Sequence, residues 1–190
     1  MRKKKNIPVF REAIAVIGEG LSEREYFKSL KQHEKLPFKF KPDIPKHSDI
    51  KSIISKAVSL SETFDLVYCI IDLDRIILNP KELDFYNKHK LKYQNILFIE
   101  SNPCFEIWFL LHFEFSGRNY SDCQSLIGLL RKYISDYSKS FNYLTNKNLY
   151  GLLKPRLDSA IKNSIKLEKS DVESKCDIYK LILELNKLKT

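Results

Sequence analysis

The sequence contains only four cysteines, and no two of them have the paired spacing of a zinc site or of a disulfide framework. We therefore expect neither feature in the folded chain. Few cysteines without a pairing pattern are typical of a reducing compartment, so we expect a cytoplasmic protein. Two of the cysteines, Cys69 and Cys104, lie in apolar stretches, and we interpret them as core residues.

Long hydrophobic runs are also missing. The longest, residues 105–113, is interrupted by Glu106 and His112. It is far shorter than the roughly 20 apolar residues that a membrane-spanning helix needs. The basic residues 1–5 are not followed by the apolar core of a signal peptide. The sequence thus predicts no membrane span and no secretory leader, and it contains neither internal repeats nor low-complexity segments.

What is present is a globular composition. The chain has 190 residues, of which 43% are hydrophobic and 30% are charged, which excludes wholesale disorder. This length suits one domain, with or without a helical appendage. The 33 Lys and Arg residues outnumber the 24 Asp and Glu residues, giving a net charge of +9. A basic surface favours a polyanionic partner, although solvated lysines alone also explain such an excess.

The first part of the chain alternates short apolar segments with amphipathic ones, which predicts a parallel sheet with right-handed crossovers and helices on its faces. The expected strands are residues 13–17, 38–40, 66–71 and 95–99, the second of them limited by Pro37, Pro42 and Pro45. The expected helices are one capped by Ser22 with Glu25 as a capping box, then 49–60, 80–90, and 104–113 with Asn102 and Pro103 at its start.

After about Ser116 the pattern changes to helices only. We expect them at residues 121–138, 155–167 and 174–188, the last with an apolar stripe at helical spacing. Residues 121–190 hold 13 Lys and Arg against 8 Asp and Glu. The predicted organisation is an α/β metal-binding domain, residues 1–115, followed by a basic helical extension, residues 116–190, packed on it.

Acidic side chains gather where the predicted strands end. Asp72 and Asp74 follow the strand 66–71, Glu19 follows the first strand, and Glu100 follows the fourth. The carboxyl ends of parallel strands are where ligands bind in such sheets. With a strand period of two, Asp72 and Asp74 point to the same side, and at about 4 Å their repulsion costs roughly 4 kcal/mol. A divalent cation, a basic side chain or protonation must compensate.

These acids also have plainer interpretations. An Asp-x-Asp pair after a strand often only caps the next helix or closes a turn, and the glycines around Glu19 can serve the tight turn alone. We interpret Glu23 and Glu25 as helix-start and capping residues rather than ligands.

Glu106 stands out because it lies in an otherwise apolar helix that begins at the same edge of the sheet. A buried ionised carboxylate needs a partner or a metal. Glu106 can therefore serve as a ligand, a supporting group or a general base. It can equally form a salt bridge to a C-terminal lysine or arginine, or be exposed. We interpret His112 as a packing residue and Trp108 as core.

Three segments resemble the RloB family. Residues 14–20, IAVIGEG, with Tyr26 and Phe27 resemble its opening strand. Residues 70–75, IIDLDR, resemble its Asp-x-Asp strand, and residues 101–113, SNPCFEIWFLLHF, are similar to its long third signature. The resemblance covers residues 13–113, and its first two motifs are shared by the wider toprim superfamily.

The resemblance implies a toprim-like fold, a parallel sheet sandwiched by helices and related to the nuclease domains of OLD-type proteins. It implies Mg²⁺ or Mn²⁺ held by Glu19, Asp72 and Asp74, while Glu106 matches the family signature with a less defined role. It also implies one half of an abortive-infection pair of the AbiL type in phage defence, whose other half is an SMC/AAA-type ATPase.

The functional hypothesis is a metal-dependent nuclease that hydrolyses phosphodiesters in DNA or RNA. Glu19, Asp72, Asp74 and Glu106 are the predicted catalytic residues, and Arg75 and the C-terminal lysines are candidates for backbone contacts. One alternative is a haloacid-dehalogenase-type phosphatase, which Asp72 and Asp74 fit superficially; that family, however, places this strand first. The other is a non-catalytic nucleic-acid-binding or regulatory module.

Overall fold

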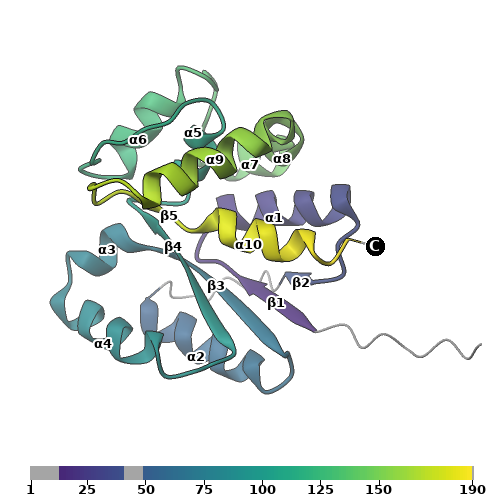
Figure 1. Cartoon of the computed structure of the whole chain (residues 1–190), viewed down its shortest axis with the longest axis vertical. Helices are drawn as coiled ribbons and strands as arrows, with labels where there is room; N and C mark the ends of the chain where they lie inside the picture. Colours follow the sequence, from purple (N-terminus) through teal and green to yellow (C-terminus); the bar gives the residue numbers. More distant parts are fainter. Residues whose placement is uncertain (1–12, 41–48, 190) are drawn as a thin grey trace, which may run out of the picture.

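A five-stranded sheet with helices on both faces organises the chain (Figure 1). The structure is a computed structural model that describes residues 13–40 and 49–189. Its strands lie in the order β2-β1-β3-β4-β5, with parallel pairing throughout except between β4 and β5. The strands are β1 (Ile14–Ile17), β2 (Lys39–Phe40), β3 (Leu66–Asp72), β4 (Ile96–Asn102) and β5 (Lys175–Cys176).

The central strands β1 and β3 are apolar because helices cover both of their faces. Every residue of β1 is buried, as are Val67 to Ile71 of β3. Ile17 pairs with Cys69, and Asp72 at the end of β3 pairs with Ser101 of β4. The predicted mixed α/β fold is confirmed, and the parallel register brings the ends of β1, β3 and β4 to one edge of the sheet.

Three helices cover one face of the sheet: α2 (Ile50–Ser61), α3 (Leu73–Ile77) and α4 (Pro80–Lys90). Their apolar side chains pack on Val67, Cys69 and Ile71. The helix α2 begins where Asp49 accepts a hydrogen bond from the Ser52 backbone N–H at 3.0 Å. The helix α4 begins at Pro80, as predicted, after the cap Asn79.

The other face carries the remaining helices in two layers (Figure 1). The side chains of Tyr68 and Ile70 of β3 belong to the same buried cluster as Phe27, Phe109 and Ile182 on this face. The helices are α1 (Leu21–Glu34), α5 (Glu106–Leu111), α6 (Cys123–Leu130), α7 (Phe141–Asn146), α8 (Leu149–Leu153), a 3-10 turn (Lys154–Arg156), α9 (Leu157–Glu168) and α10 (Ile178–Asn186).

Two predicted helix starts are wrong. The helix α1 begins at Leu21 after Gly20, without a side-chain cap, because the Ser22 hydroxyl bonds to Glu106 instead. Asn102 belongs to strand β4 rather than to a helix cap, and its bond to Pro103 is cis. The helix α5 consequently begins at Glu106, later than predicted.

Two predicted C-terminal helices also differ from the structure. The helix expected over residues 121–138 ends at Leu130 in α6, and turns follow it. The helix expected from Ser174 begins at Ile178, because residues 175–176 form the edge strand β5. The apolar stripe of α10 is confirmed, since Ile178, Leu181, Ile182 and Leu185 are all buried.

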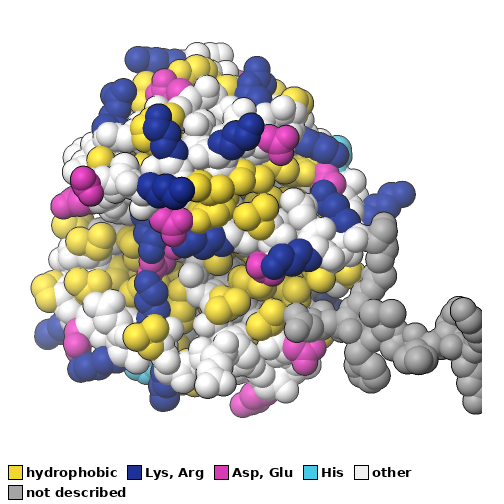
Figure 2. Space-filling view, viewed as in Figure 1, with side chains coloured by type: hydrophobic (Ala, Val, Ile, Leu, Met, Phe, Trp, Pro, Cys, Tyr) yellow, Lys and Arg dark blue, Asp and Glu magenta, His cyan; other side chains and the backbone are white. Residues whose placement is uncertain are grey.

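In Figure 2, Lys and Arg side chains are scattered over the region of α9 and α10, with acidic and hydrophobic side chains between them. Within the described ranges, no helix combines the length and the apolar character that a bilayer crossing requires. The basic residues 1–5 and the prolines Pro42 and Pro45 lie outside the described residues.

Candidate functional site

An acidic pocket lies at the carboxyl edge of the sheet, where β1 and β3 end. Its volume is about 240 Å³. The acids come from the turn after β1, from α1, from the end of β3 and from α3. The facing wall comes from the segment between β4 and α5, from α6 and from the turn after α6. The lining residues are Glu19, Gly20, Glu23, Asp72, Asp74, Arg75, Cys104, Cys123 and Lys139. We call this cavity the acidic pocket.

Glu19 and Asp72 meet because β1 and β3 are neighbours. The Asp72 backbone N–H donates to Glu19 Oε1 at 3.3 Å. Burial raises the pKa of Glu19 to about 8, and the nearby Glu23 charge adds to the effect. Burial likewise raises the pKa of Asp72 well above its ordinary range, helped by the charges of Glu23 and Glu19. The predicted convergence of these two acids is therefore present, and it is electrostatically unfavourable without a cation.

Asp72 also has an unsatisfied atom. Its Oδ1 is buried and has no hydrogen-bond partner. Buried polar atoms are nearly always paired, so an unpaired carboxylate oxygen at a pocket is a position suited to a water or an ion as partner.

Asp74 lines the same pocket, but not for the predicted reason. The strand ends at Asp72 and α3 begins at Leu73, so the strand period of two does not apply to Asp74. Its Oδ1 accepts a hydrogen bond from the Arg75 backbone N–H at 2.7 Å. The exposed Arg75 side chain lies at the pocket as well.

Glu23 is a site residue that the sequence analysis assigned to helix capping. It is 3% exposed, although it is an acid in the first turn of α1. Burial and the charge of Glu106 raise its pKa to about 7. A Cβ at Gly20 would stand 2.6 Å from Glu23 Oε2, so a larger residue there would require the Glu23 side chain to shift from the position it takes at the helix start.

Glu106 is fully buried behind the pocket rather than in its lining. Its Oε1 accepts hydrogen bonds from the Ser22 hydroxyl at 2.8 Å and from the Tyr137 hydroxyl at 2.7 Å. Its Oε2 forms an ion pair with Lys139 Nζ at 3.0 Å. The interpretation of Glu106 as the partner of a C-terminal lysine is thus confirmed, while its predicted catalytic role stays a prediction.

Lys139 lines the acidic pocket as a second cation beside Arg75, and no pattern in the sequence pointed to it. Burial lowers its pKa, but the charge of Glu106 and the hydrogen bond to it raise the pKa overall, with Asp72 and Glu23 adding to the rise. Its side chain remains 47% exposed. Lys139 therefore stays charged and presents its ammonium group between the buried Glu106 and the pocket.

A disulfide joins Cys104 to Cys123 in the wall of the pocket, which corrects the expectation that the cysteines would stay unpaired. The two residues are separated by 19 positions in sequence, a spacing that no short motif contains. The other two cysteines, Cys69 and Cys176, are free and buried. The core position predicted for Cys69 is confirmed, and Cys104 is buried too.

Glu100 does not join the other acids, because its charge is already neutralised. It lies outside the lining of the acidic pocket and forms ion pairs with Lys90 and Lys175. Tyr86 donates a hydrogen bond to its Oε1 at 2.6 Å. Burial alone would raise the pKa of Glu100, but these donors lower it overall. This network fastens α4, β4 and β5 together.

The donor types of the acidic pocket suit a hard divalent cation, although among the described residues the carboxylate oxygens of Glu19, Asp72 and Asp74 do not all lie within 4.8 Å of one another. Glu19, Asp72 and Asp74 offer carboxylate oxygens, the ligands that Mg²⁺ and Mn²⁺ prefer. The unpaired Asp72 Oδ1 and the raised pKa values of Glu19 and Asp72 are both features that a bound cation would relieve.

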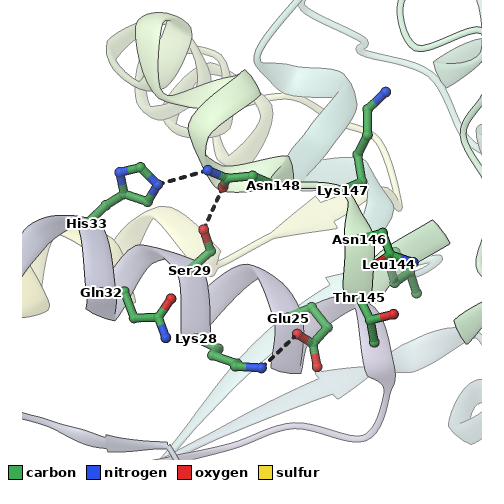
Figure 3. A pocket seen from close by; sticks show the side chains of 10 residues that line it. All are labelled: Glu25, Lys28, Ser29, Gln32, His33, Leu144, Thr145, Asn146, Lys147 and Asn148. Atoms are coloured by element: carbon green, nitrogen blue, oxygen red, sulfur yellow. Dashed lines mark hydrogen bonds and ion pairs between the residues drawn. The ribbon is translucent and has the colours of Figure 1, made fainter. Parts of the chain in front are cut away.

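A second pocket, also about 240 Å³, lies between α1 and the α7–α8 segment (Figure 3). The Ser29 hydroxyl donates to Asn148 Oδ1 at 2.6 Å, and the Asn148 amide contacts His33 Nε2 at 2.9 Å. These groups bond to one another across the two elements, so we interpret the contact as one that holds α1 against α8.

The fold and the acidic pocket together define a class: α/β proteins with a carboxylate-lined pocket at the carboxyl ends of parallel strands. A family model described as RloB-like protein matches residues 14–185, and the chain belongs to this family. Neither a curated protein nor a solved structure matches the chain.

Proposed function

We propose that the chain is a toprim-like, Mg²⁺- or Mn²⁺-dependent nuclease that hydrolyses phosphodiester bonds in nucleic acid. The observation that carries the proposal is the convergence of Glu19 and Asp72, with a buried Asp72 oxygen that has no partner. Carboxylates that crowd at the edge of a sheet in this way are suited to a cation that also binds a phosphate.

Each residue of the pocket has a role in this proposal. Glu19, Asp72 and Asp74 hold the metal, which when bound polarises the phosphate and lowers the pKa of the attacking water. Glu23 lines the same pocket and would accept the proton of an attacking water.

The cations at the pocket rim bind the substrate. Lys139 and Arg75 contact phosphate oxygens, and Lys139 is held in place by its ion pair with Glu106. Glu106 is therefore a positioning residue in this scheme. The net charge of +9 favours sequence-independent binding to the nucleic-acid backbone, which weakens as salt is added.

A cleavage panel tests the proposal. Plasmid DNA, single-stranded DNA and RNA are incubated with the wild type, Glu19→Gln and Asp72→Asn, with Mg²⁺ or Mn²⁺ and with EDTA. We expect metal-dependent cleavage by the wild type and a loss of roughly 100-fold or more in both variants, because each removes a metal ligand. Asp84→Asn is the matched control, since Asp84 is exposed and pairs only with Lys88. Full activity in both pocket variants would refute the proposal.

The same purified proteins also test the two alternative functions, a non-catalytic nucleic-acid-binding module and a phosphatase. A non-catalytic module would bind nucleic acid in a filter assay yet cleave nothing. A phosphatase would turn over a generic phosphomonoester and trap an aspartyl-phosphate. The arrangement favours the nuclease over the phosphatase, because the strand that leads to Asp72 and Asp74 follows another strand, β1, that ends beside Glu19.

Membership in the RloB-like family supports a second part of the proposal: action in phage defence with an SMC/AAA-type ATPase partner. Co-expression with an ATPase of this class, followed by co-purification, tests the pairing. We expect cleavage to rise when the partner is present and ATP is supplied.

A further inference from the structure

The Cys104–Cys123 disulfide occupies an unusual place, because it is part of the wall of the acidic pocket. Cys104 lies in the segment that joins β4 to α5, and Cys123 is the first residue of α6. The bond thus connects two segments that both face the acids of the pocket. A disulfide that only stabilises the fold does not need to lie in the wall of a pocket.

A carboxylate and an ammonium group adjoin the sulfur atoms. Cys123 Sγ lies 3.5 Å from Glu106 Oε2 and 3.7 Å from Lys139 Nζ. The two sulfur atoms and a Glu106 oxygen all lie within 4.8 Å of one another. Two thiols and one carboxylate are a donor set suited to one metal ion, and reduction of the disulfide would supply the two thiols.

We propose that reduction of the Cys104–Cys123 disulfide opens a Zn²⁺ site in the wall of the acidic pocket, with Cys104, Cys123 and Glu106 as ligands. This site is distinct in its donors from the oxygen site of the proposed nuclease and goes beyond that function. A dithiol supplies the two electrons and two protons of the reduction and becomes a disulfide itself. The two protein thiols then release their protons as they coordinate the metal.

The geometry of the backbone is compatible with both states. The Cα atoms of the two cysteines are 5.6 Å apart. A tetrahedral Zn²⁺ with Zn–S bonds of about 2.3 Å spaces its two sulfur ligands about 3.8 Å apart. Rotation about the Cα–Cβ bonds changes the spacing between the two sulfur atoms while the Cα atoms stay in place. Water completes the coordination.

The ligand types direct Zn²⁺ and Mg²⁺ to different sites. Thiolates select Zn²⁺ over Mg²⁺, whereas Glu19, Asp72 and Asp74 offer only oxygen. In the oxidised chain the sulfur atoms cannot act as thiolates, and Lys139 neutralises Glu106. In the reduced, zinc-bound chain the metal takes over that neutralisation, which releases Lys139 from the buried carboxylate.

Cobalt spectroscopy of the full chain tests the proposal. The protein is reduced with a phosphine, freed of it, and titrated with Co²⁺, whose thiolate complexes give a sulfur-to-metal charge-transfer band in the near ultraviolet. We expect this band to saturate at one equivalent and to disappear when one equivalent of Zn²⁺ is added. The oxidised chain should give no band.

Variants identify the ligands. Zn²⁺ affinity is measured by competition with a chromogenic chelator, and we expect a loss of at least about 100-fold in Cys104→Ser and Cys123→Ser. Glu106→Gln keeps both thiols and should bind more weakly than the wild type while retaining the cobalt band. Cys176→Ser is the matched control, because Cys176 is a buried free cysteine outside the pocket, and its affinity should be unchanged.

Several results would overturn the proposal: a reduced wild type without the cobalt band, equal Zn²⁺ affinity in the oxidised and reduced chains, or full affinity in both cysteine variants. Circular dichroism of each variant shows whether it is folded, so a lost site is distinguished from a lost fold. The cobalt band and the Zn²⁺ affinity are measured without any cleavage assay, so failure of the proposed nuclease activity would not affect the test of the zinc site.

Discussion

At the scale of single residues, the acidic pocket places three carboxyl groups where their charges repel. The pKa values of Glu19 and Glu23 rise to about 8 and about 7, and the pKa of Asp72 rises as well. Burial is the largest cause in each case. A group that must be protonated or paired with a cation is a poor contributor to stability, and such perturbed groups cluster at functional sites.

This conflict predicts that Asp72→Asn stabilises the metal-free chain. The amide removes one repelling charge while keeping the size of the side chain, and we expect the midpoint of thermal unfolding to rise by about 2–4 °C per kcal/mol gained. In the wild type, Mg²⁺ should raise the midpoint, because it binds only the folded state. In Asp72→Asn that rise should be lost.

Differential scanning fluorimetry with and without Mg²⁺ measures both effects. Asp84→Asn is the control, since its carboxylate is exposed and its removal relieves no buried repulsion. A variant that is less stable than the wild type without metal, and that still responds to Mg²⁺, would contradict the electrostatic account.

His112 makes folding sensitive to acid. It is 1% exposed and its Nδ1 lies 2.8 Å from the Trp108 carbonyl oxygen. Burial lowers its pKa to about 4, and the positive charge of Arg156 acts in the same direction. The folded state therefore favours the neutral ring. Its contribution to stability is complete above the unfolded pKa, about 6.5, and is lost as the pH falls from there towards 4.

We expect the free energy of unfolding to decrease by up to about 1.4 kcal/mol per pH unit within this window through His112 alone. Urea titrations between pH 7 and pH 4 measure the decrease, and His112→Gln should have a shallower slope than the wild type. Other groups titrate in both proteins, so the difference between the slopes is the decisive quantity. Parallel slopes would mean that His112 is not buried as a neutral ring.

Some residues of the acidic pocket could be predicted from the sequence pattern, whereas others are recognised only in the folded structure. Glu19 and Asp72 were predictable because each follows an apolar strand, and parallel strands end at one edge. Lys139 and Cys123 were not, since the turn after α6 and the start of α6 carry no motif, and both residues reach the pocket through tertiary packing. Glu23 was misread because an acid in the first turn of a helix is usually a capping residue.

At the scale of elements, the strands and the helices α2 and α4 followed from apolar periodicity and caps, because local sequence decides them. The edge strand β5 did not. It consists of Lys175 and Cys176, too few residues for a period, and it forms because Ser101 and Asn102 of β4 offer unpaired backbone groups. Long-range pairing of this kind leaves no local signal.

The short helix α5 is the element on which the site depends. All six of its residues are buried, and it carries Glu106 at its start. Phe109 on this helix contacts Phe105 one turn earlier, as well as Tyr26 of α1 and Tyr137 of the segment after α6. We therefore expect Phe109→Ala to destabilise the fold by about 3–5 kcal/mol.

Denaturant titration measures this loss. Leu91→Ala is the control, because Leu91 is 89% exposed and its truncation opens no cavity; we expect a change within about 0.5 kcal/mol. An equally small effect of Phe109→Ala would show that α5 is not packed as described.

At the scale of the whole molecule, the core on one face of the sheet runs through both segments that the sequence suggested. Phe27 and Ile70 belong to the same buried cluster as Leu126, Leu153 and Leu181. The helix α5 contacts both α6 and α9. Composition and charge distinguish residues 116–190 from the rest of the chain. Composition does not reveal that the apolar faces of these later helices pack on the helices and the sheet of the first segment.

This shared core predicts that residues 1–115 do not fold as an isolated fragment. Without the later helices, Trp108, Phe109 and Leu110, each 0% exposed in the full chain, would face water. Uncovering several such side chains costs roughly 1.5–3 kcal/mol each, and the total rivals the stability of an ordinary domain. The Cys104–Cys123 bond and the Lys139–Glu106 ion pair would be lost with them.

Calorimetry of the full chain should show one transition, with equal calorimetric and van't Hoff enthalpies. The fragment should bind a hydrophobic dye and show no cooperative melt, whereas a sharp transition at a temperature near that of the full chain would mean that two independent domains, not one, hold the acidic pocket in shape.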